Sequence, residues 1–164
     1  MPGRALCPTC HQGLPTEVRA AWPRPTPPGL CPPWATAAYA GTMRDLILAM
    51  KEDGVRSLCN PLGRQLAWAV ERAAADVPLG CRVALVPIPS RTSSVRQRGG
   101  DAILTMVQGA QRALVGDRVR PSAEVAPLLK LRSGVLDQSE LGAEARADNM
   151  IGSMFVPHER LRRL

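Results

Sequence analysis

The stretch that decides the fold reads Val83-Ala84-Leu85-Val86-Pro87-Ile88-Pro89-Ser90, and it is followed by Arg91 and by Arg96-Gln97-Arg98-Gly99-Gly100-Asp101. An apolar run interrupted by two prolines predicts a buried strand that stops abruptly, because each proline removes a backbone donor. The loop that follows carries hydroxyl groups, three arginines and a pair of glycines whose amides can approach a ligand closely. Asp101 is placed to cap the helix that begins there. This pattern predicts a site for phosphate or pyrophosphate, formed by Ser90, Arg91, Arg96, Arg98, Gly99 and Gly100.

The rest of the chain alternates between helix and strand patterns. Thr42 and Asp45 approximate a capping box at the start of one helix, and Gly54 is placed to end it. Asn60 and Pro61 predict the cap and the first turn of a second helix, whose apolar residues recur at spacings of three and four. Further patterns predict a helix over residues 101–116, a strand over 125–131, a short helix over 139–148 and an apolar stretch over 150–156. Helices that alternate with short buried strands indicate an α/β domain.

Composition and charge limit the class of protein. The 164 residues have room for one domain of ordinary size and a small appendage. No apolar run reaches the roughly 18–20 residues that cross a bilayer, and the first residues contain no signal core, so we expect a cytoplasmic protein without a membrane span. The net charge of +7, with 19 arginines and two lysines, makes DNA contact an alternative. Scattered arginines and few aromatic rings for stacking on bases weaken that alternative.

The five cysteines argue against a disulfide framework in the cytoplasm and favour metal ligands or free thiols. Cys7-Pro8-Thr9-Cys10 has the spacing of half a zinc site, and Cys31 is the candidate third ligand. We expect either a Zn²⁺ site with an unassigned fourth ligand or a metal-free remnant of a knuckle. Residues 22–29 are rich in proline and predict a stiff linker. The expected division is a cysteine-containing segment with this linker over residues 1–36 and an α/β domain over residues 37–164.

Four motifs occur in the same order as in a known family. They are Cys7-Pro8-Thr9-Cys10, Tyr39 with Met50-Lys51-Glu52-Asp53-Gly54, Val86-Pro87-Ile88-Pro89 with Arg98-Gly99-Gly100-Asp101, and finally Gln138, Leu141, Arg146 and Asn149. In these motifs the chain resembles the ComF family, whose members are related to type I phosphoribosyltransferases and are associated with competence for DNA uptake. The resemblance implies an incomplete phosphoribosyltransferase-like parallel sheet flanked by helices, with a small N-terminal cysteine knuckle. It also implies that phosphoribosyl pyrophosphate (PRPP) binds with Mg²⁺ at a site shaped by Lys51, Gln138, Arg146 and Asn149.

The chain departs from the family pattern in three places. Trp34 stands where the family has a fourth cysteine, and Gly100 stands where it has an aromatic residue. Family members continue after the last motif with a strand that ends in two acidic residues and a Thr-Thr-Gly turn, which binds the ribose 5-phosphate, whereas this chain ends at Leu164 without them. We therefore expect a C-terminally truncated member that does not turn over PRPP by itself. A sheet that lacks this strand is also expected to be only marginally stable.

Three functions stay open on the sequence. The first is a ComF-like protein of phosphoribosyltransferase fold that is linked to DNA uptake, acts with DNA-uptake proteins or DNA, and is not catalytic as this chain. The second is an active phosphoribosyltransferase completed by a missing segment, in which the arginines stabilise the departing pyrophosphate. The third is a small basic nucleic-acid-binding protein with a zinc knuckle. The sequence contains neither the acidic pair with Thr-Thr-Gly nor four zinc ligands, so the first hypothesis is preferred.

Overall fold

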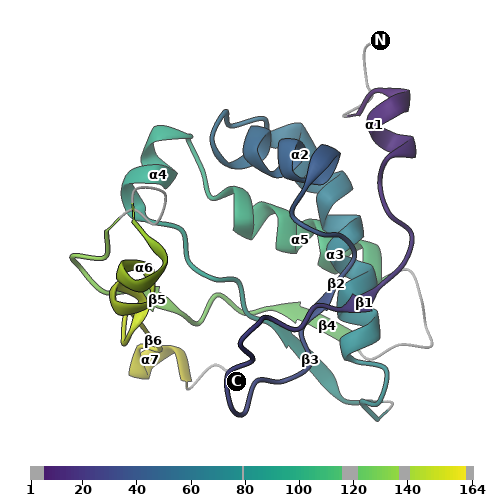
Figure 1. Ribbon diagram of the computed structural model, residues 1–164. Helices are drawn as coiled ribbons and strands as arrows, with labels where there is room; N and C mark the ends of the chain where they lie inside the picture. The colour runs from purple at the N-terminus through teal and green to yellow at the C-terminus, as the bar shows by residue number, and fades with distance from the viewer. Residues whose placement is uncertain (1–5, 79, 116–121, 137–140, 162–164) are drawn as a thin grey trace.

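The computed structural model describes residues 6–78, 80–115, 122–136 and 141–161 of the 164-residue chain (Figure 1). Its helices are α1 (Pro8–Gln12), α2 (Gly41–Lys51), the short 3₁₀ helix η1 (Arg56–Leu58), α3 (Cys59–Ala73), α4 (Thr92–Gln97), α5 (Ala102–Leu114), α6 (Ala143–Met150) and α7 (His158–Leu161). Its strands are β1 (Arg19–Ala20), β2 (Trp34–Ala35), β3 (Arg82–Leu85), β4 (Ser122–Val125), β5 (Lys130–Leu131) and β6 (Met154–Phe155). Within these residues β3 and β4 pair in parallel, while β1–β2 and β5–β6 are antiparallel pairs. The expected α/β class is confirmed.

The parallel pair β3–β4 and the helices α3 and α5 form the centre of the molecule. The two strands are in register from Arg82 opposite Ser122 to Leu85 opposite Val125. Both helices lie on the same side of this pair (Figure 1). Because side chains alternate along a strand, Leu85 is buried against the helices whereas Ala84 is exposed on the other face. The core between the helices and the strands contains Ala67, Leu85, Val107, Ala110 and Leu114.

Helices α3 and α5 touch through their backbones at Gly63. A Cβ atom on Gly63 would lie 2.6 Å from the carbonyl oxygen of Met106 and 2.9 Å from the amide nitrogen of Ala110. Real Cβ atoms do not come this close to backbone atoms, so only glycine permits this approach. Ala67 and Ala110 are also small and almost fully buried in the core. The small residues of the two helices therefore let the helix axes come close together.

A second core cluster holds the end of α2 against the starts of α3 and α5. It consists of Leu6, Met43, Leu46, Met50, Leu58, Cys59, Leu62 and Ala102. Met50 and Cys59 are each only 1% exposed. Burial of an aliphatic side chain of this size contributes roughly 1.5–3 kcal/mol, so the last turn of α2 is firmly placed. This matters for the site, since Lys51 follows Met50 directly.

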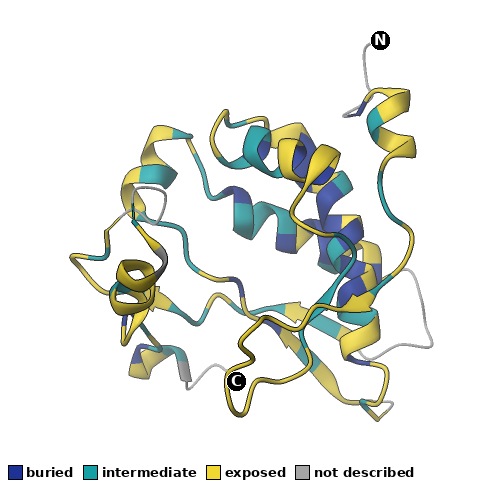
Figure 2. Cartoon of the chain, viewed as in Figure 1, coloured by how far each residue is buried: buried dark blue, intermediate teal, exposed yellow. Residues whose placement is uncertain are grey.

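The N-terminal and C-terminal segments lie at the periphery. Strand β2 packs on α3, where the guanidinium carbon of Arg72 lies 4.1 Å from the centre of the Trp34 ring. At the other end of the chain, β5 and β6 pair with Leu131 opposite Met154. Figure 2 shows that buried positions gather in α2, α3 and α5, whereas α6 is mainly exposed.

The prediction of a buried strand over residues 83–88 is wrong in two respects. Regular pairing stops at Leu85, and one face of the segment is open, because the helices cover the other face only. Val86 and Ile88 are 39% and 57% exposed. Among the described residues β3 pairs with β4 alone, so its second edge is unpaired. Most of the strand expected over residues 125–131 is absent, because β4 ends at Val125 and β5 comprises only Lys130–Leu131. Pro127, which has no amide donor, lies between them.

The expected helix starts are right in one case and wrong in two. Asp101 caps α5, because its carboxylate accepts hydrogen bonds from two backbone amides of the first turn. Helix α2 begins after Ala40 without any side-chain cap, so the expected capping box is absent. Helix α3 begins at Cys59, directly after η1, and Pro61 is its third residue. The short helix expected over residues 139–148 appears as α6, and residues 139 and 140 lie outside the described chain.

Candidate anion-binding site

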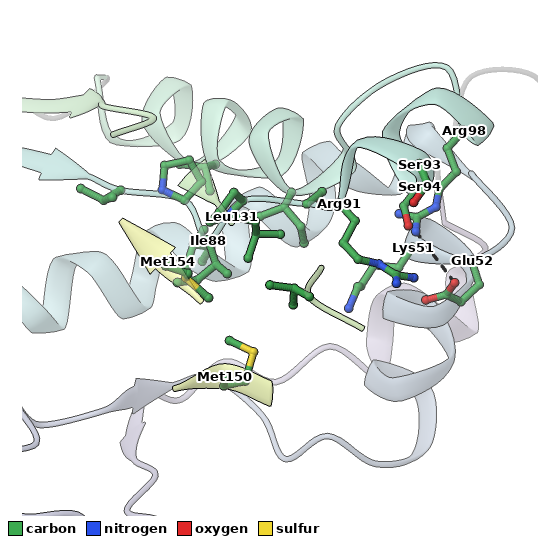
Figure 3. A pocket seen from close by; sticks show the side chains of 18 of the residues that line it. Lys51, Glu52, Ile88, Arg91, Ser93, Ser94, Arg98, Leu131, Met150 and Met154 are labelled. Carbon is green, nitrogen blue, oxygen red and sulfur yellow. Dashed lines mark ion pairs between the residues drawn. The ribbon is translucent and has the colours of Figure 1, made fainter. Parts of the chain in front are cut away.

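A cavity of about 1000 Å³ opens where the chain leaves β3. The carboxyl end of a parallel strand is a common place for ligands in α/β proteins. The walls come from the end of α2, residues 84–91, α4, and a C-terminal wall that includes residues of β5, α6 and β6 (Figure 3). The polar lining residues are Lys51, Glu52, Ser90, Arg91, Ser93, Ser94, Gln97 and Arg98, and the apolar ones include Ile88, Leu131, Leu136, Met150 and Met154.

The polar end of the cavity is positively charged. Three basic side chains, those of Lys51, Arg91 and Arg98, line it together with one carboxylate, that of Glu52. Nη2 of Arg98 lies 4.0 Å from Oε2 of Glu52, and the side chains are 15% and 59% exposed respectively. Because Glu52 is largely in solvent, this pair adds little stability and mainly directs the guanidinium. Lys51 makes no ion pair with any described residue.

Arg56 holds the loop that carries Arg98. Its Nη1 donates to the carbonyl oxygen of Gly99 at 2.9 Å. A Cβ atom on Gly100 would lie 2.6 Å from the same Nη1, so the guanidinium occupies the space that a larger residue would need. No sequence pattern indicates this contact, because Arg56 belongs to no motif and lies 43 residues from its partner. Arg56 is thus a functional candidate that no sequence pattern revealed, whereas Glu52 lies in a motif but was expected to have no role in the site.

Ser90 fastens the loop to α5. Its hydroxyl donates to Oδ1 of Asp101 at 2.8 Å, and the same oxygen accepts from the amides of Ile103 and Leu104 at 3.0 and 3.2 Å. Ser90 lines the cavity as predicted, but its hydroxyl hydrogen is committed to Asp101. An anion needs a hydrogen-bond donor, and the hydroxyl of Ser90 already donates to Asp101. Ser90 therefore positions the loop in this structure and does not contact the anion through this hydrogen.

The glycine amides do not face the cavity as the sequence suggested. The amide of Gly99 donates to the carbonyl of Arg96 at 3.3 Å, and that of Gly100 donates to the carbonyl of Val95 at 3.0 Å. The physical reason is that residues 92–97 form α4 instead of an open loop, and the glycine amides close its C-terminal end. Arg96 is exposed on this helix and lies outside the cavity lining, so the structure does not bring it to the predicted site.

The four residues that the family resemblance assigned to shaping the site differ in whether they line the cavity. Lys51 lines the cavity, and Gln138 lies outside the described residues. Arg146 is exposed on α6 and is not part of the lining. Asn149 donates through Nδ2 to the carbonyl of Leu136 at 3.1 Å and accepts at Oδ1 from the amide of Leu136 at 3.0 Å. Asn149 therefore shapes the cavity indirectly, because Leu136 lines it.

In comparisons with known proteins, no protein-family model, curated protein or solved structure matches this chain. Within the described residues, no helix is both long and apolar enough to cross a membrane.

The structure brings two of the three candidate zinc ligands together. Cys7 caps α1, and its Sγ accepts a hydrogen bond from the amide of Cys10 at 3.4 Å. This bond from Cys10 lowers the pKa of Cys7, while the hydrogen bond between the two thiols raises the pKa of Cys10. Cys31 is exposed, and among the described residues no cluster of three His, Cys, Asp or Glu side chains is arranged to hold a metal ion. Zinc binding at these cysteines stays a prediction.

Proposed function

We propose that this chain is a ComF-like protein of phosphoribosyltransferase type that binds the pyrophosphate group of PRPP, or pyrophosphate itself, in the cavity beyond β3. The observation that supports this proposal most directly is that Lys51 at the end of α2 lines one cavity together with Arg91 and Arg98, which flank α4. The proposal includes a role beside DNA-uptake proteins, which rests on the resemblance of the four sequence motifs.

The chemistry of these side chains suits a polyvalent anion. A guanidinium presents donors in a planar fork that matches two phosphate oxygens, and a lysine ammonium adds a point charge. The hydroxyls of Ser93 and Ser94 supply further donors at the same end of the cavity (Figure 3). With three cations and one carboxylate among the described lining residues, the site is complementary to the multiple charges of pyrophosphate.

The described residues fit Mg²⁺ only as an ion carried by the ligand. Mg²⁺ requires oxygen ligands and retains several water molecules. Glu52 is the one carboxylate among the described lining residues, and it already faces Arg98. The pyrophosphate oxygens would therefore supply most of the ligands of Mg²⁺. The bound ion would reduce the net negative charge of the ligand that the basic side chains contact.

Calorimetric titration of the 164-residue protein with pyrophosphate, with and without Mg²⁺, tests this proposal. The Arg98→Ala variant is expected to bind more weakly by about 1.5–3 kcal/mol, which is roughly 10- to 150-fold in Kd. Arg96→Ala serves as the matched control, because it removes the same side chain from an exposed position on α4 outside the cavity. Its affinity is expected to stay within about twofold of the wild type, the range of an exposed charge.

Two outcomes would overturn the proposal. One is a folded wild-type protein that does not bind pyrophosphate. The other is an equal loss of affinity in Arg96→Ala and Arg98→Ala, which would show that only the general positive charge of the chain matters. Circular dichroism of each variant separates loss of binding from loss of fold, and Lys51→Ala provides a second change at the cavity.

A further inference from the structure

The cavity has two chemically different ends, and pyrophosphate accounts for only one of them. In Figure 3 the basic and hydroxyl side chains lie toward the right, whereas Ile88, Leu131, Met150 and Met154 lie toward the left. The apolar end has its own walls from three segments of the chain, namely the segment after β3, the antiparallel pair β5–β6, and α6. A ligand that fills the cavity must therefore be anionic at one end and apolar at the other.

Large apolar side chains are exposed at this end of the cavity. Val86, Ile88, Leu136 and Met150 are 39%, 57%, 60% and 37% exposed, and all four line the cavity. A single exposed aliphatic side chain is ordinary, but a group that faces one hollow from several segments is typical of a binding surface. The group adjoins the basic end, so one molecule can contact both.

The composition of the apolar end favours an aliphatic partner over a nucleobase. A base is recognised by stacking on aromatic rings and by hydrogen bonds to its polar edge. Among the described lining residues, Tyr39 supplies the aromatic ring and Gln97 supplies the side-chain amide, and the other apolar residues are Ala, Val, Ile, Leu, Met and Pro. Methionine adapts its shape to flexible apolar groups. The volume of about 1000 Å³ is at the upper end for small-molecule pockets and accommodates a diphosphate with an attached chain.

We infer that this site also binds, beyond pyrophosphate itself, the diphosphate ester of an aliphatic alcohol of isoprenoid size. This inference rests on the proposed function, because the diphosphate occupies the site proposed above for pyrophosphate. Lys51, Arg91 and Arg98 hold the diphosphate, and the chain lies along Ile88 and Met150.

Calorimetry with three probes tests the inference on the 164-residue protein: inorganic pyrophosphate, geranyl diphosphate and geraniol. Each buried methylene is worth roughly fourfold in affinity, so geranyl diphosphate is expected to bind at least about 30-fold tighter than pyrophosphate. Geraniol is expected to bind at least about 10-fold more weakly than geranyl diphosphate, because it lacks the charge-assisted hydrogen bonds.

Substitutions of apolar lining residues test the inference in a second way. Ile88→Ser and Met150→Gln are each expected to lower the ratio of the geranyl diphosphate affinity to the pyrophosphate affinity by at least about fivefold. Ile151→Ser is the control, because Ile151 is 79% exposed beside Met150 and does not line the cavity. Its ratio is expected to match that of the wild type.

The possible results separate the inference from the proposed function. Equal affinities for pyrophosphate and geranyl diphosphate overturn the inference and leave the proposed function standing. Failure of the protein to bind either diphosphate overturns both. Tight binding of geraniol, or a ratio unchanged in both wall variants, also overturns the inference, since the two ends would then not act on one molecule.

Discussion

Replacing Gly63 by alanine tests the close contact between α3 and α5, the two helices on which the site is built. The added Cβ would lie 2.6 Å from the carbonyl oxygen of Met106, 2.9 Å from the amide nitrogen of Ala110 and 2.9 Å from the carbonyl carbon of Gly109. All three atoms belong to the backbone of α5, so no flexible side chain can turn aside. Helices α3 and α5 would have to separate by several tenths of an ångström.

Two opposing contributions set the size of the effect. Alanine is favoured over glycine within a helix by roughly 0.5–1 kcal/mol. Overpacking a well-packed contact is unfavourable by typically 1–3 kcal/mol, and the upper part of that range applies because the whole helix must move. Separation also loosens the buried side chains of the core on α5, such as Val107 and Ala110. We expect Gly63→Ala to lower the free energy of unfolding by about 1–2 kcal/mol.

Urea denaturation followed by far-ultraviolet circular dichroism measures this difference, and an unchanged slope with urea shows that the same transition is compared. Gly13→Ala is the matched control. Gly13 has a φ of −77°, and the nearest atom to its added Cβ is Oγ1 of Thr42 at 3.5 Å, an ordinary contact. The control is expected to unfold at the wild-type urea concentration or slightly above it. A Gly63→Ala protein as stable as the wild type would refute the close helix contact.

Three further expectations follow from single contacts. Arg56→Ala removes the donor to the carbonyl of Gly99 and should weaken pyrophosphate binding about threefold to tenfold in calorimetry, by 0.5–1.5 kcal/mol; an unchanged Kd would show that this hydrogen bond does not order the loop. Gln65 is buried and its Oε1 has no partner among the described residues, so Gln65→Met should raise the free energy of unfolding by about 1 kcal/mol, and a loss of stability would contradict this. The amide of Cys10 lowers the pKa of Cys7, whereas the pKa of Cys10 is raised. Alkylation at a pH below the ordinary thiol pKa of about 8.5 should therefore modify Cys7 before Cys10, which peptide mass mapping would show. Faster modification of Cys10 would contradict the hydrogen bond.

The elements that local sequence determines were predictable. Asp101 followed by an apolar face predicted the start of α5, because a capping carboxylate and helical periodicity act over a few residues. A strand before Pro87 was also foreseeable, although neither its end at Leu85 nor the exposure of Val86 and Ile88 was. Whether Val86 and Ile88 are covered depends on which helices reach that face, and this is decided by packing between distant segments.

The candidate site was predictable in its charge and not in its geometry. Arg91 and Arg98 line the cavity, in agreement with the arginine-rich pattern, whereas Arg96 is exposed and is not part of the lining. Residues 92–97 carry three hydroxyl residues and no apolar stripe, so nothing in their pattern predicted α4. Once this helix forms, its end requires the amides of Gly99 and Gly100, and the expected anion contacts from these amides are lost.

The shape of the cavity depends on the packing of α3 against α5 at Gly63, although Gly63 itself does not line the cavity. Ser90 is bonded to Asp101 at the start of α5, and Arg56, just before α3, is bonded to Gly99. Each bond contributes only about 0.5–1.5 kcal/mol, so each holds its geometry only while α3 and α5 keep their relative position. Gly63→Ala shifts that position and should therefore weaken pyrophosphate binding, although Gly63 itself is not a lining residue. The Gly13→Ala protein should keep the wild-type affinity, and equal affinities in both variants would show that the loop keeps its shape independently of the two helices.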